Sequence, residues 1–418
     1  MTASQIPSHA PVVIVGAGLA GLTAARVLNQ RGIDTVILES SDDVGGRVRS
    51  DNVDGFILDR GFQVLLTAYP EIHRHLNLDA LNLQYFEPGA IVWKSGRGHV
   101  VSDPFRRPGT FASTALAPIG TLGDKLRIAK MRATLKSASP QDLLRAEDIP
   151  TVDALRNMGF SDVMVKSFFT SLVGGIQLDP KLQTSRRMFD MIFRTLATGD
   201  TAVPALGMGQ ITQQLLSSLT RSQLHLNTAV QKISAHEVHL TDGRRIEADT
   251  IIVATEGPVA SKLLGLPEVP SRAAGCVYFS APVAPINGSY IVLDGKGEGP
   301  VLNVAVMSHI SSHYAPKGTH LIAAAMPGKA EGDLESLART QLRGWWGAQV
   351  DQWTHLRTYR IAHGQPGQNP PFSPKKKLSL GDGLFVCGDH RDTGSIQGAM
   401  FSGRRCAEMV SEQVTLSA

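Results

Sequence analysis

Three glycines and one acid near the N-terminus have the types and spacing needed to bind a dinucleotide. Gly16, Gly18 and Gly21 lie in VVIVGAGLAGLTAARVLNQRGIDTVILE, residues 12–39, which ends on Glu39. Gly16 permits a tight turn, Gly18 leaves room for a pyrophosphate, and Gly21 lets a helix pack closely on a sheet. A carboxylate at Glu39 accepts hydrogen bonds from ribose hydroxyls, which favours FAD or NAD over NADP.

The elements that must position these residues follow in the required order. An apolar run before Gly16 predicts a strand, a helical pattern follows the glycines, and a second apolar run ends on Glu39. Free N–H groups at the start of the helix, including those of Leu19 and Ala20, favour a bound anion. The alternative is an ordinary strand–helix turn, which needs none of this order. The sequence therefore predicts a dinucleotide site.

A glycine pair and an arginine follow the acid. Gly45, Gly46 and Arg47 lie in SSDDVGGRVRS, residues 40–50. Taken alone, this stretch is typical of a surface turn with a solvated arginine. After the glycine motif, E-x(5)-GGR resembles the flavin-containing amine oxidase superfamily, which includes monoamine and polyamine oxidases, protoporphyrinogen oxidase and phytoene desaturases. The resemblance implies that Arg47 lies along the FAD pyrophosphate and ribityl chain, where its fork of donors suits the acceptors.

Two central segments are similar to the same superfamily. GFILDRGFQVLL, residues 55–66, resembles the strand and turn whose backbone passes the isoalloxazine ring. LHLNTAVQKISAHEVHLTDGRRIEADTIIVAT, residues 224–255, contains a hairpin signal at Asp242 and Gly243. The resemblance implies an adenine contact through the backbone at Val230, and that the final IVAT closes the FAD domain.

The segment GLFVCGDHRDTGSIQGAMFSGRRCAEMV, residues 383–410, resembles the closing motif of the superfamily. The resemblance implies that Asp389 binds the ribityl chain. It also implies a helix beginning near Ile396 whose N–H groups, around Ala399, face the flavin pyrimidine edge, where a positive helix end stabilises reduced flavin. The predicted cofactor residues are Gly16, Gly18, Leu19, Ala20, Gly21, Glu39, Ser40, Gly45, Gly46, Arg47, Gly61, Phe62, Gln63, Val230, Ala254, Gly388, Asp389, Ser395, Ile396 and Ala399.

The length of 418 residues and the resemblance together imply two domains in an α/β fold. Residues 1–89, 206–270 and 369–418 are predicted to form a Rossmann-type FAD-binding domain of the glutathione-reductase-like, amine oxidase type. Residues 90–205 and 271–368 are predicted to form an inserted α+β substrate domain, with a helical insert and a mixed sheet.

Composition excludes several other classes of protein. A net charge of +4 and a pI of 8.9 are too weak a basic excess to predict nucleic-acid binding. Three cysteines without CxxC spacing predict neither a disulfide framework nor a metal site, and they indicate a reducing compartment. Because there is no secretory signal and no long apolar stretch, the sequence predicts a cytoplasmic protein.

Two segments leave peripheral membrane contact open as an alternative. FASTALAPI, residues 111–119, is either a docking or entry loop or a buried turn. Lys375, Lys376 and Lys377 form either a solvated connection or a contact with anionic lipid headgroups. The oligomeric state is not predicted.

Further details place the chain within the superfamily. Residues 169–178, 204–215 and 358–366 resemble the protoporphyrinogen oxidase and phytoene desaturase branch. Ser395 stands where amine oxidases carry a tyrosine of their aromatic cage, and GCVYFS, residues 275–280, lacks their flavin lysine. A trapped amine cation is therefore disfavoured. Because the flavin-bonding cysteine of some members also has no counterpart, we expect non-covalent FAD.

The resemblance implies an FAD-dependent oxidoreductase of desaturase or oxidase type. It would dehydrogenate a C–C, C–N or C–O bond of a mainly apolar small molecule, carotenoid- or porphyrinogen-like, by hydride transfer to flavin N5, with O₂ or a quinone as acceptor. The alternatives are an amine oxidase without the aromatic cage and an isomerase that needs reduced flavin but performs no net oxidation.

No catalytic acid or base is assigned from the sequence. His390, next to Asp389, is the candidate, and a loop histidine bonded to backbone is its alternative. His309, His313 and His363 are lesser candidates, and Gln63 and Tyr290 are considered as residues that face the substrate.

Overall fold

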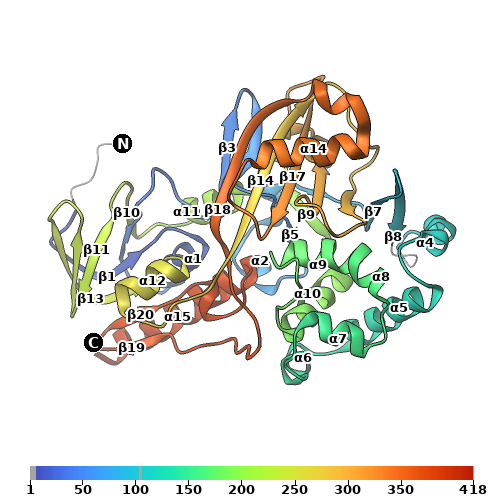
Figure 1. Ribbon diagram of the computed structural model, residues 1–418. Helices are drawn as coiled ribbons and strands as arrows, with labels where there is room; N and C mark the ends of the chain where they lie inside the picture. Colours follow the sequence, from blue (N-terminus) through green and yellow to red (C-terminus); the bar gives the residue numbers. More distant parts are fainter. Residues whose placement is uncertain (1–5, 103–105, 418) are drawn as a thin grey trace.

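The computed structural model describes residues 6–102 and 106–417. These residues form two large sheets with helices around them (Figure 1). The first sheet has eight strands: β10 (Ser222–His225), β2 (Thr35–Leu38), β1 (His9–Val15), β13 (Arg245–Val253), β12 (Glu237–Leu240) and β11 (Val230–Ser234) in that order, with β20 (Leu384–Val386) on β13 and β19 (Ser379–Gly381) on β20. The α/β architecture, with a parallel centre in the first sheet and a second, mixed sheet, confirms the predicted fold class. The predicted domain boundaries stay a prediction.

The centre of the first sheet is parallel and buried. Strand β1 pairs in parallel with β2 and β13, with Val15 opposite Val253. Strand β13 alternates exposed and buried residues where it forms the predicted hairpin with β12, and is fully buried at Ile251–Val253, where it pairs with β1 and β20. This change from alternating to continuous burial is what a strand shows when both of its faces become covered.

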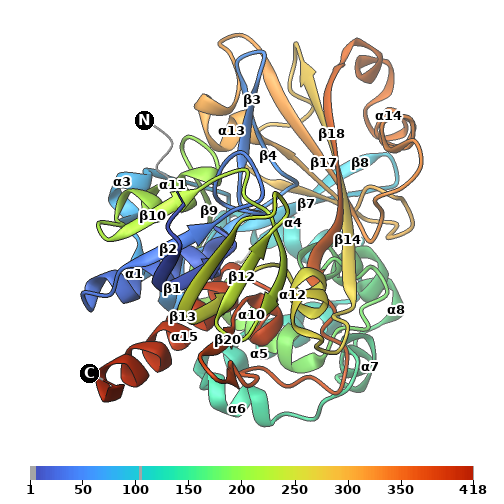
Figure 2. The ribbon, with the colours of Figure 1, turned by 90° about the vertical axis from the view of Figure 1, so that its left-hand side faces the viewer.

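Helices cover the first sheet and meet at its carboxyl edge. Helices α1 (Leu19–Gln30) and α15 (Ile396–Ser417) pack together beside β1 (Figure 2). A Cβ atom on Gly403 would lie 2.2 Å from the carbonyl oxygen of Ala20, so glycine permits this close crossing. The other helices of this part are α2 (Pro70–His75), α3 (Leu78–Leu81), α11 (Gly209–Ser217) and α12 (Gly257–Leu264).

The second sheet joins distant parts of the chain. Its order is β18 (Thr354–Pro366), β14 (Ser271–Ala281), β17 (His320–Pro327), β16 (Asn303–Val306), β15 (Ile291–Asp294), β7 (Gly89–Lys94) and β8 (Arg97–Ser102). The strands predicted in the two inserts thus share one sheet, because β7 pairs in parallel with β15. Helices α13 (Met307–Ile310) and α14 (Leu334–Trp346) accompany it.

A helical lobe lies beside β7 and β8. It comprises α4 (Phe111–Leu116), α5 (Leu122–Ser137), α6 (Pro140–Arg145), α7 (Thr151–Asn157), α8 (Asp162–Met164), α9 (Thr170–Ile176) and α10 (Arg186–Thr198). Its core surrounds Phe169, whose ring meets those of Phe160 and Phe189 edge to face. Residues 111–116 form a helix, so the prediction of a loop or turn there is wrong; Ala117 and Ile119 are buried and Leu116 is exposed.

Two small sheets connect the large ones. Strands β3 (Ser50–Val53) and β4 (Phe56–Asp59) form a hairpin, and β9 (Thr201–Pro204) pairs with β5 (Leu65–Leu66) and β6 (Leu83–Tyr85). Among the described residues, no helix is both long and apolar enough to cross a membrane.

Candidate functional site

The turn from β1 into α1 is built on glycine. Gly16 has a φ of +104°, and a Cβ atom there would lie 3.0 Å from the carbonyl oxygen of Ala254. At Gly21 a Cβ atom would lie 2.0 Å from the carbonyl oxygen of Gly16. Neither position accepts a side chain, so α1 approaches the end of β1 and β13 more closely than another sequence allows.

Gly18 differs from these two glycines because it faces open space. A Cβ atom at Gly18 would meet no atom within 4 Å, and one at Gly46 would meet only the Gly18 Cα, at 3.7 Å. Gly18 precedes α1 without a side-chain cap, so the N–H groups of Leu19 and Ala20 in the first turn have no capping oxygen. The first turn of α1 therefore offers an anion both room and donors.

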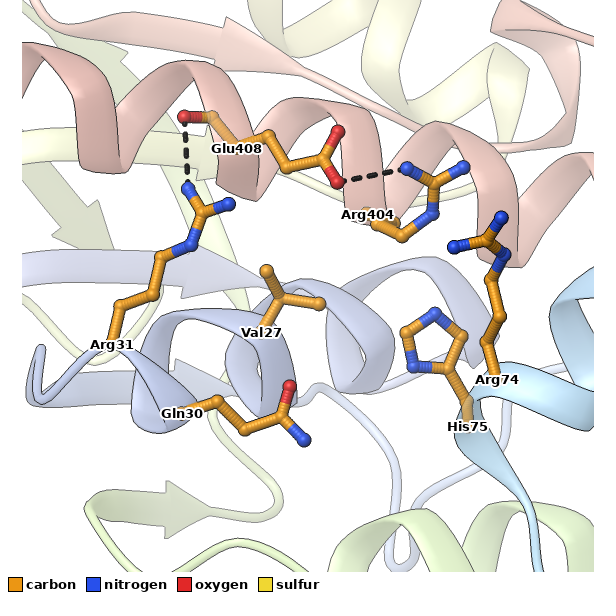
Figure 3. Close-up of a pocket in the computed structure, with 7 residues that line it drawn as sticks. All are labelled: Val27, Gln30, Arg31, Arg74, His75, Arg404 and Glu408. Atoms are coloured by element: carbon orange, nitrogen blue, oxygen red, sulfur yellow. Dashed lines mark hydrogen bonds and ion pairs between the residues drawn. The ribbon is translucent and has the colours of Figure 1, made fainter.

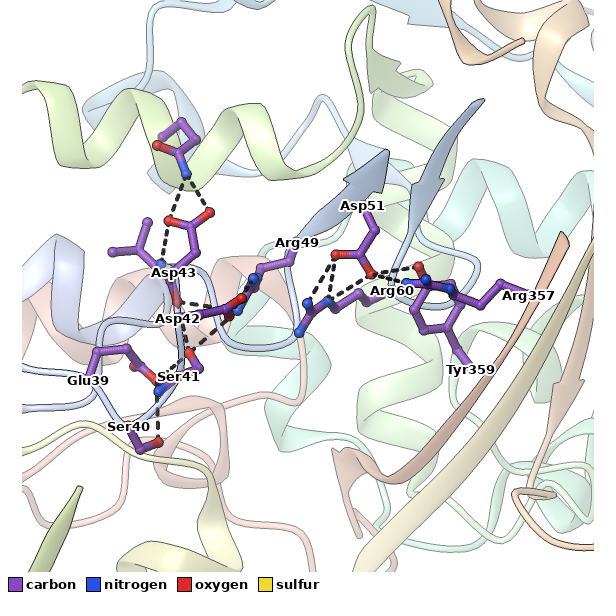
Figure 4. Close-up of polar contacts among 12 residues, drawn as sticks. Glu39, Ser40, Ser41, Asp42, Asp43, Arg49, Asp51, Arg60, Arg357 and Tyr359 are labelled. Atoms are coloured by element: carbon purple, nitrogen blue, oxygen red, sulfur yellow. Dashed lines mark hydrogen bonds and ion pairs between the residues drawn. The ribbon is translucent and has the colours of Figure 1, made fainter. Parts of the chain in front are cut away.

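The Glu39 carboxylate is held beside this turn. Its Oε2 accepts a hydrogen bond from the Ala17 N–H at 2.8 Å. Its Oε1 accepts from the Ser41 N–H and hydroxyl at 2.9 and 2.7 Å (Figure 4). Oε2 keeps a lone pair for a ribose hydroxyl. The next residue in the chain, Ser40, is exposed.

The predicted adenine segment lies against the same acid. The N–H of Thr228 donates to the Glu39 carbonyl at 2.8 Å, and that of Asn227 donates to the Ser41 carbonyl at 2.9 Å. Val230, at the start of β11, is partly buried and follows two residues later. The fold thus brings Val230 near Glu39 across almost two hundred residues of sequence.

Arg47 and Asp389 form an ion pair at 2.9 Å, and Arg47 also donates to the Gly364 carbonyl at 2.8 Å. Asp389 is 5% exposed. Burial would raise the pKa of Asp389, but the Arg47 guanidinium outweighs it and holds that pKa below its ordinary value. Gly45, with a φ of +116°, donates to the Ala17 carbonyl and so ties the arginine's loop to the first glycine turn.

The segment predicted beside the isoalloxazine ring is fixed by its neighbours. Gly61 has a φ of +96°, and a Cβ atom there would lie 2.7 Å from Ile361 Cδ1. Gln63 donates through Nε2 to the carbonyls of Arg47 and Arg60 at 2.7 and 2.9 Å, so it positions backbone and does not present a free amide. Phe62 meets Phe86 edge to face.

The start of α15 completes the set. Gly388 has a φ of +144° and donates to the Ser402 hydroxyl. Ser395 caps the helix by accepting from the Gly398 N–H at 3.0 Å. In the first turn of α15 the N–H of Ala399 donates to the Ser395 carbonyl, so the described N–H groups of this turn that have no bond are those of Ile396 and Gln397. Helix α15 thus begins at Ile396, as predicted, and the N–H of Ala399, which the resemblance placed at the flavin edge, is bonded within the first turn.

Two predicted histidines flank the Arg47–Asp389 pair. His390 is 3% exposed, and neither ring nitrogen has a partner in the described chain, so the alternative of a backbone-bonded histidine is wrong. His363 contacts the Ser271 hydroxyl through Nδ1 at 2.7 Å, while its Nε2 has no partner there. Burial lowers the pKa of each to about 4, so both are neutral near pH 7.

The other candidates lie apart from this pair. His309 packs against His320 and contacts the Gly288 carbonyl, and His313 is exposed. Tyr290 packs on the cluster behind the second sheet. Within residues 6–102 and 106–417, none of the three has a hydrogen bond or ion pair with Arg47 or Asp389.

Sequence reasoning missed two groups around the site. Tyr69 is partly buried, and desolvation raises its pKa to about 12, while a hydrogen bond with Ser395 opposes that rise. Asp59 is 1% exposed and accepts from Ser50, Tyr314 and the Met208 N–H. No spacing signals Tyr69, whereas Asp59 lies two residues before Gly61 in a segment that the resemblance had already marked.

A pocket of about 320 Å³ lies outside this set, between α1, α2 and α15 (Figure 3). Its charged groups are already paired: Arg404 binds both oxygens of Glu71 at 2.8 and 2.9 Å and also binds Glu408. This network ties α2 to α15 and stabilises the helix that presents Ile396.

The geometry fits FAD. Open space over Gly18, uncapped N–H groups on α1 and an oriented Glu39 suit the adenosine and pyrophosphate, and Arg47 and Asp389 suit the phosphate and ribityl groups. The fold and the site together define a dinucleotide-binding α/β protein that carries a second, inserted sheet.

The chain belongs to the flavin containing amine oxidoreductase family, whose sequence model matches residues 19–411. It is an FAD-dependent oxidoreductase, as the sequence predicts. Coproporphyrinogen III oxidase of Propionibacterium freudenreichii subsp. freudenreichii is 26% identical over 86% of this chain and 79% of its own length. The 15-cis-phytoene desaturase of Glycine max is 20% identical over 97% of this chain and 80% of its own length.

Solved structures share the fold across nearly the whole chain. An oxidoreductase from Methanosarcina mazei has a TM-score of 0.72 at 16% identity, covering 95% of this chain and 99% of that one. Putrescine oxidase bound to putrescine has a TM-score of 0.70 at 16% identity, covering 97% and 99%. At such identities these similarities support the fold and leave the substrate open.

Proposed function

We propose that this protein dehydrogenates a porphyrinogen-type macrocycle, with O₂ or a quinone as electron acceptor. The observation that carries the substrate class is the similarity to coproporphyrinogen III oxidase, which extends over 86% of this chain. FAD, when bound, accepts a hydride equivalent at N5 and passes electrons to the acceptor. The family alone leaves the substrate undefined.

We propose that the twenty predicted cofactor residues hold FAD non-covalently. Glu39 binds the adenosine ribose, Val230 contacts the adenine through its backbone, and the first turn of α1 binds the pyrophosphate. Arg47 and Asp389 separate from each other enough to bind the phosphate and ribityl groups. The N–H groups of Ile396 and Gln397 supply the positive helix end at the flavin pyrimidine.

We propose that His390 accepts the proton that leaves the substrate. A neutral imidazole accepts a proton without first losing one, and both of its ring nitrogens are free of partners in the described chain. His363 offers only its Nε2, because Nδ1 is held by Ser271. We therefore assign the proton to His390 and an orienting role to His363.

The site gives no support to an amine cage. Tyr278 and Tyr359, the tyrosines of the sheet face near Gly61, are perpendicular at 90° with centroids 5.9 Å apart, and Tyr359 donates to Asp51. An amine cation between two ring faces requires rings on opposite sides of it. A polyene remains the second candidate substrate, because the phytoene desaturase similarity covers 97% of this chain.

The test is anaerobic mixing of the FAD-loaded protein with coproporphyrinogen III, followed by air. On anaerobic mixing we expect loss of the oxidised-flavin absorbance. After air is admitted we expect flavin reoxidation with peroxide and then a rise in porphyrin fluorescence, because full oxidation of the macrocycle needs repeated two-electron reductions of the flavin. Reduction by phytoene alone would favour the polyene, and reduction by putrescine would favour an amine oxidase. Turnover of any of them only while the flavin is kept reduced, without net electron transfer, would favour the isomerase and overturn the proposal.

A further inference from the structure

A run of three lysines lies on the surface between β18 and β19. Lys375, Lys376 and Lys377 are all exposed. Their backbone is bonded to the turn that follows Gly388. The N–H of Lys376 donates to the Arg391 carbonyl at 2.8 Å, and Arg391 donates through Nη2 to the Lys377 carbonyl. The run therefore has one fixed place against the turn that also carries Asp389.

Two arginines add their charges to this run. Arg391 belongs to the turn itself, and Arg405 lies on α15. The Arg405 Cζ and the Lys375 Nζ are 5.6 Å and 5.8 Å from the centre of the same Phe401 ring. Asp392 supplies one carboxylate beside them. The three lysines and two arginines, which we call the basic cluster, thus set five positive charges against this carboxylate.

The acids on the other side of α15 do not neutralise the basic cluster. Arg404 is a third cation on the Phe401 ring, at 5.1 Å. It binds both oxygens of Glu71 at 2.8 and 2.9 Å, and it binds Glu408 at 2.8 Å (Figure 3). Both carboxylates already share this arginine, so the positive charge of the basic cluster stays in excess.

The basic cluster also has donors that lack acceptors. Arg391 Nε and Arg405 Nη1 are buried, and within the described part of the chain neither has a hydrogen-bond partner. A buried polar group left unpaired costs about 1–3 kcal/mol. Desolvation and, after it, repulsion by Arg391 lower the pKa of Lys376. The arrangement is therefore unfavourable by itself, and a ligand with several anionic oxygens would stabilise it.

We propose that the basic cluster binds a polyphosphate group, meaning two or more linked phosphates. Arginine presents a planar fork of donors and lysine a point charge, and both suit phosphate oxygens. A single carboxylate would balance only one of the excess charges, whereas linked phosphates carry several. The first turn of α1 is assigned to the FAD pyrophosphate, so this would be a second phosphate site. It does not depend on which substrate the protein oxidises.

The test is calorimetric titration of the FAD-loaded full chain with inorganic pyrophosphate, in magnesium-free buffer at constant ionic strength. Loading with FAD keeps the proposed α1 site filled. Wild-type protein should bind one pyrophosphate per chain and melt at a higher temperature with it. Lys376→Gln, Arg391→Gln and Arg405→Gln should each weaken the affinity about tenfold. Lys376→Arg keeps the charge and should bind within about threefold of wild type.

Lys317→Gln is the matched control, because Lys317 is exposed on the loop before β17, outside the basic cluster. It should bind pyrophosphate as wild type does. Without pyrophosphate, Lys376→Gln should melt at or above the wild-type temperature, because it removes a repulsion. A lower melting temperature with unchanged pyrophosphate affinity would make the lysine structural and overturn the proposal.

Three further results would overturn it. The first is the absence of saturable pyrophosphate binding to wild-type protein. The second is an equal rise in melting temperature with sodium chloride at the same ionic strength, because the effect would then be screening alone. The third is binding to phosphatidylglycerol vesicles without binding to pyrophosphate, because the cluster would then recognise a lipid headgroup and not a free polyphosphate.

Discussion

At the scale of single residues, the glycines of the first turn separate into two kinds. Gly21 has no room for a Cβ atom, whereas Gly18 faces open space. We therefore predict that Gly21→Ala lowers the free energy of unfolding by about 1–3 kcal/mol through overpacking. Gly18→Val should leave the apo protein within about 0.5 kcal/mol of wild type and yet abolish FAD binding. Chemical unfolding and FAD titration check both. Equal FAD affinity in Gly18→Val and wild type would contradict the pyrophosphate assignment.

Asp59 predicts a stability that depends on pH. Burial raises its pKa to about 6, and hydrogen bonds from Ser50, Tyr314 and Met208 oppose part of that rise. An unfolded aspartate titrates near 3.9, so the contribution of Asp59 to stability is fully present below about pH 4 and is lost as the pH rises through 6. The loss amounts to about 3 kcal/mol.

The comparison that isolates this group is wild type against Asp59→Asn, unfolded in urea at pH 5 and pH 8. Asp190 also has a pKa of about 6 through burial and remains in both proteins. The decrease in stability between the two pH values should therefore be smaller in Asp59→Asn. Parallel curves would show that Asp59 ionises normally.

The Arg47–Asp389 pair predicts non-additive substitutions. Arg47→Gln leaves a carboxylate that is 5% exposed without its partner, which we expect to cost about 3 kcal/mol of stability at neutral pH. Adding Asp389→Asn removes the unpaired charge and should restore most of that loss. A double-mutant cycle on the apo protein measures the coupling; additive free energies would mean that the two groups act separately.

Much of the site was predictable at this scale, and the reason is local. Gly16 to Glu39 is a contiguous motif whose chemistry follows from spacing, and Gly45 to Arg47 is a contiguous motif whose role the resemblance implies. The partners of Arg47 were not predictable in the same way, because Gly364 and Asp389 are more than three hundred residues away in sequence. Nor does any pattern show that Gln63 uses its amide to hold backbone.

At the scale of elements, the close crossing of α1 and α15 fixes where the N-terminal turns of both helices lie. Gly403→Ala would place a Cβ atom 2.2 Å from the Ala20 carbonyl oxygen, so we predict a loss of about 1–3 kcal/mol and weaker FAD binding. Gly344→Ala in α14 is the matched control. Its Cβ atom meets nothing within 4 Å, so helix propensity should stabilise the protein by up to about 1 kcal/mol. Thermal unfolding of both variants tests the contrast, and equal shifts would contradict the close crossing.

The elements themselves followed the periodicity of the sequence, while their pairing did not. The hairpin of β12 and β13 and the strands of both inserts are where alternation and turn residues indicate, and α15 starts at Ile396, as the resemblance implies. Helix α4 was missed because its six residues are too few for a helical repeat to be visible. The parallel pairing of β7 with β15 depends on two segments about two hundred residues apart, which periodicity does not report.

At the scale of the whole molecule, three separated stretches meet around one proposed cofactor. The N-terminal glycines follow β1 and the C-terminal Gly388–Ala399 segment follows β20, so both lie at the carboxyl ends of strands in the first sheet, which also contains β10 to β13. Strand β18 of the second sheet reaches this place through Gly364. The second sheet and the helical lobe lie beyond it (Figure 1).

The most direct test of the central claim is an FAD titration of the apo protein, followed by flavin fluorescence. The account predicts saturation at one FAD per chain and no saturation in Gly18→Val. Because the FAD is not covalently bound, it should be released when the protein is denatured. Binding of NAD in place of FAD, or failure of the folded protein to bind any flavin, would contradict it.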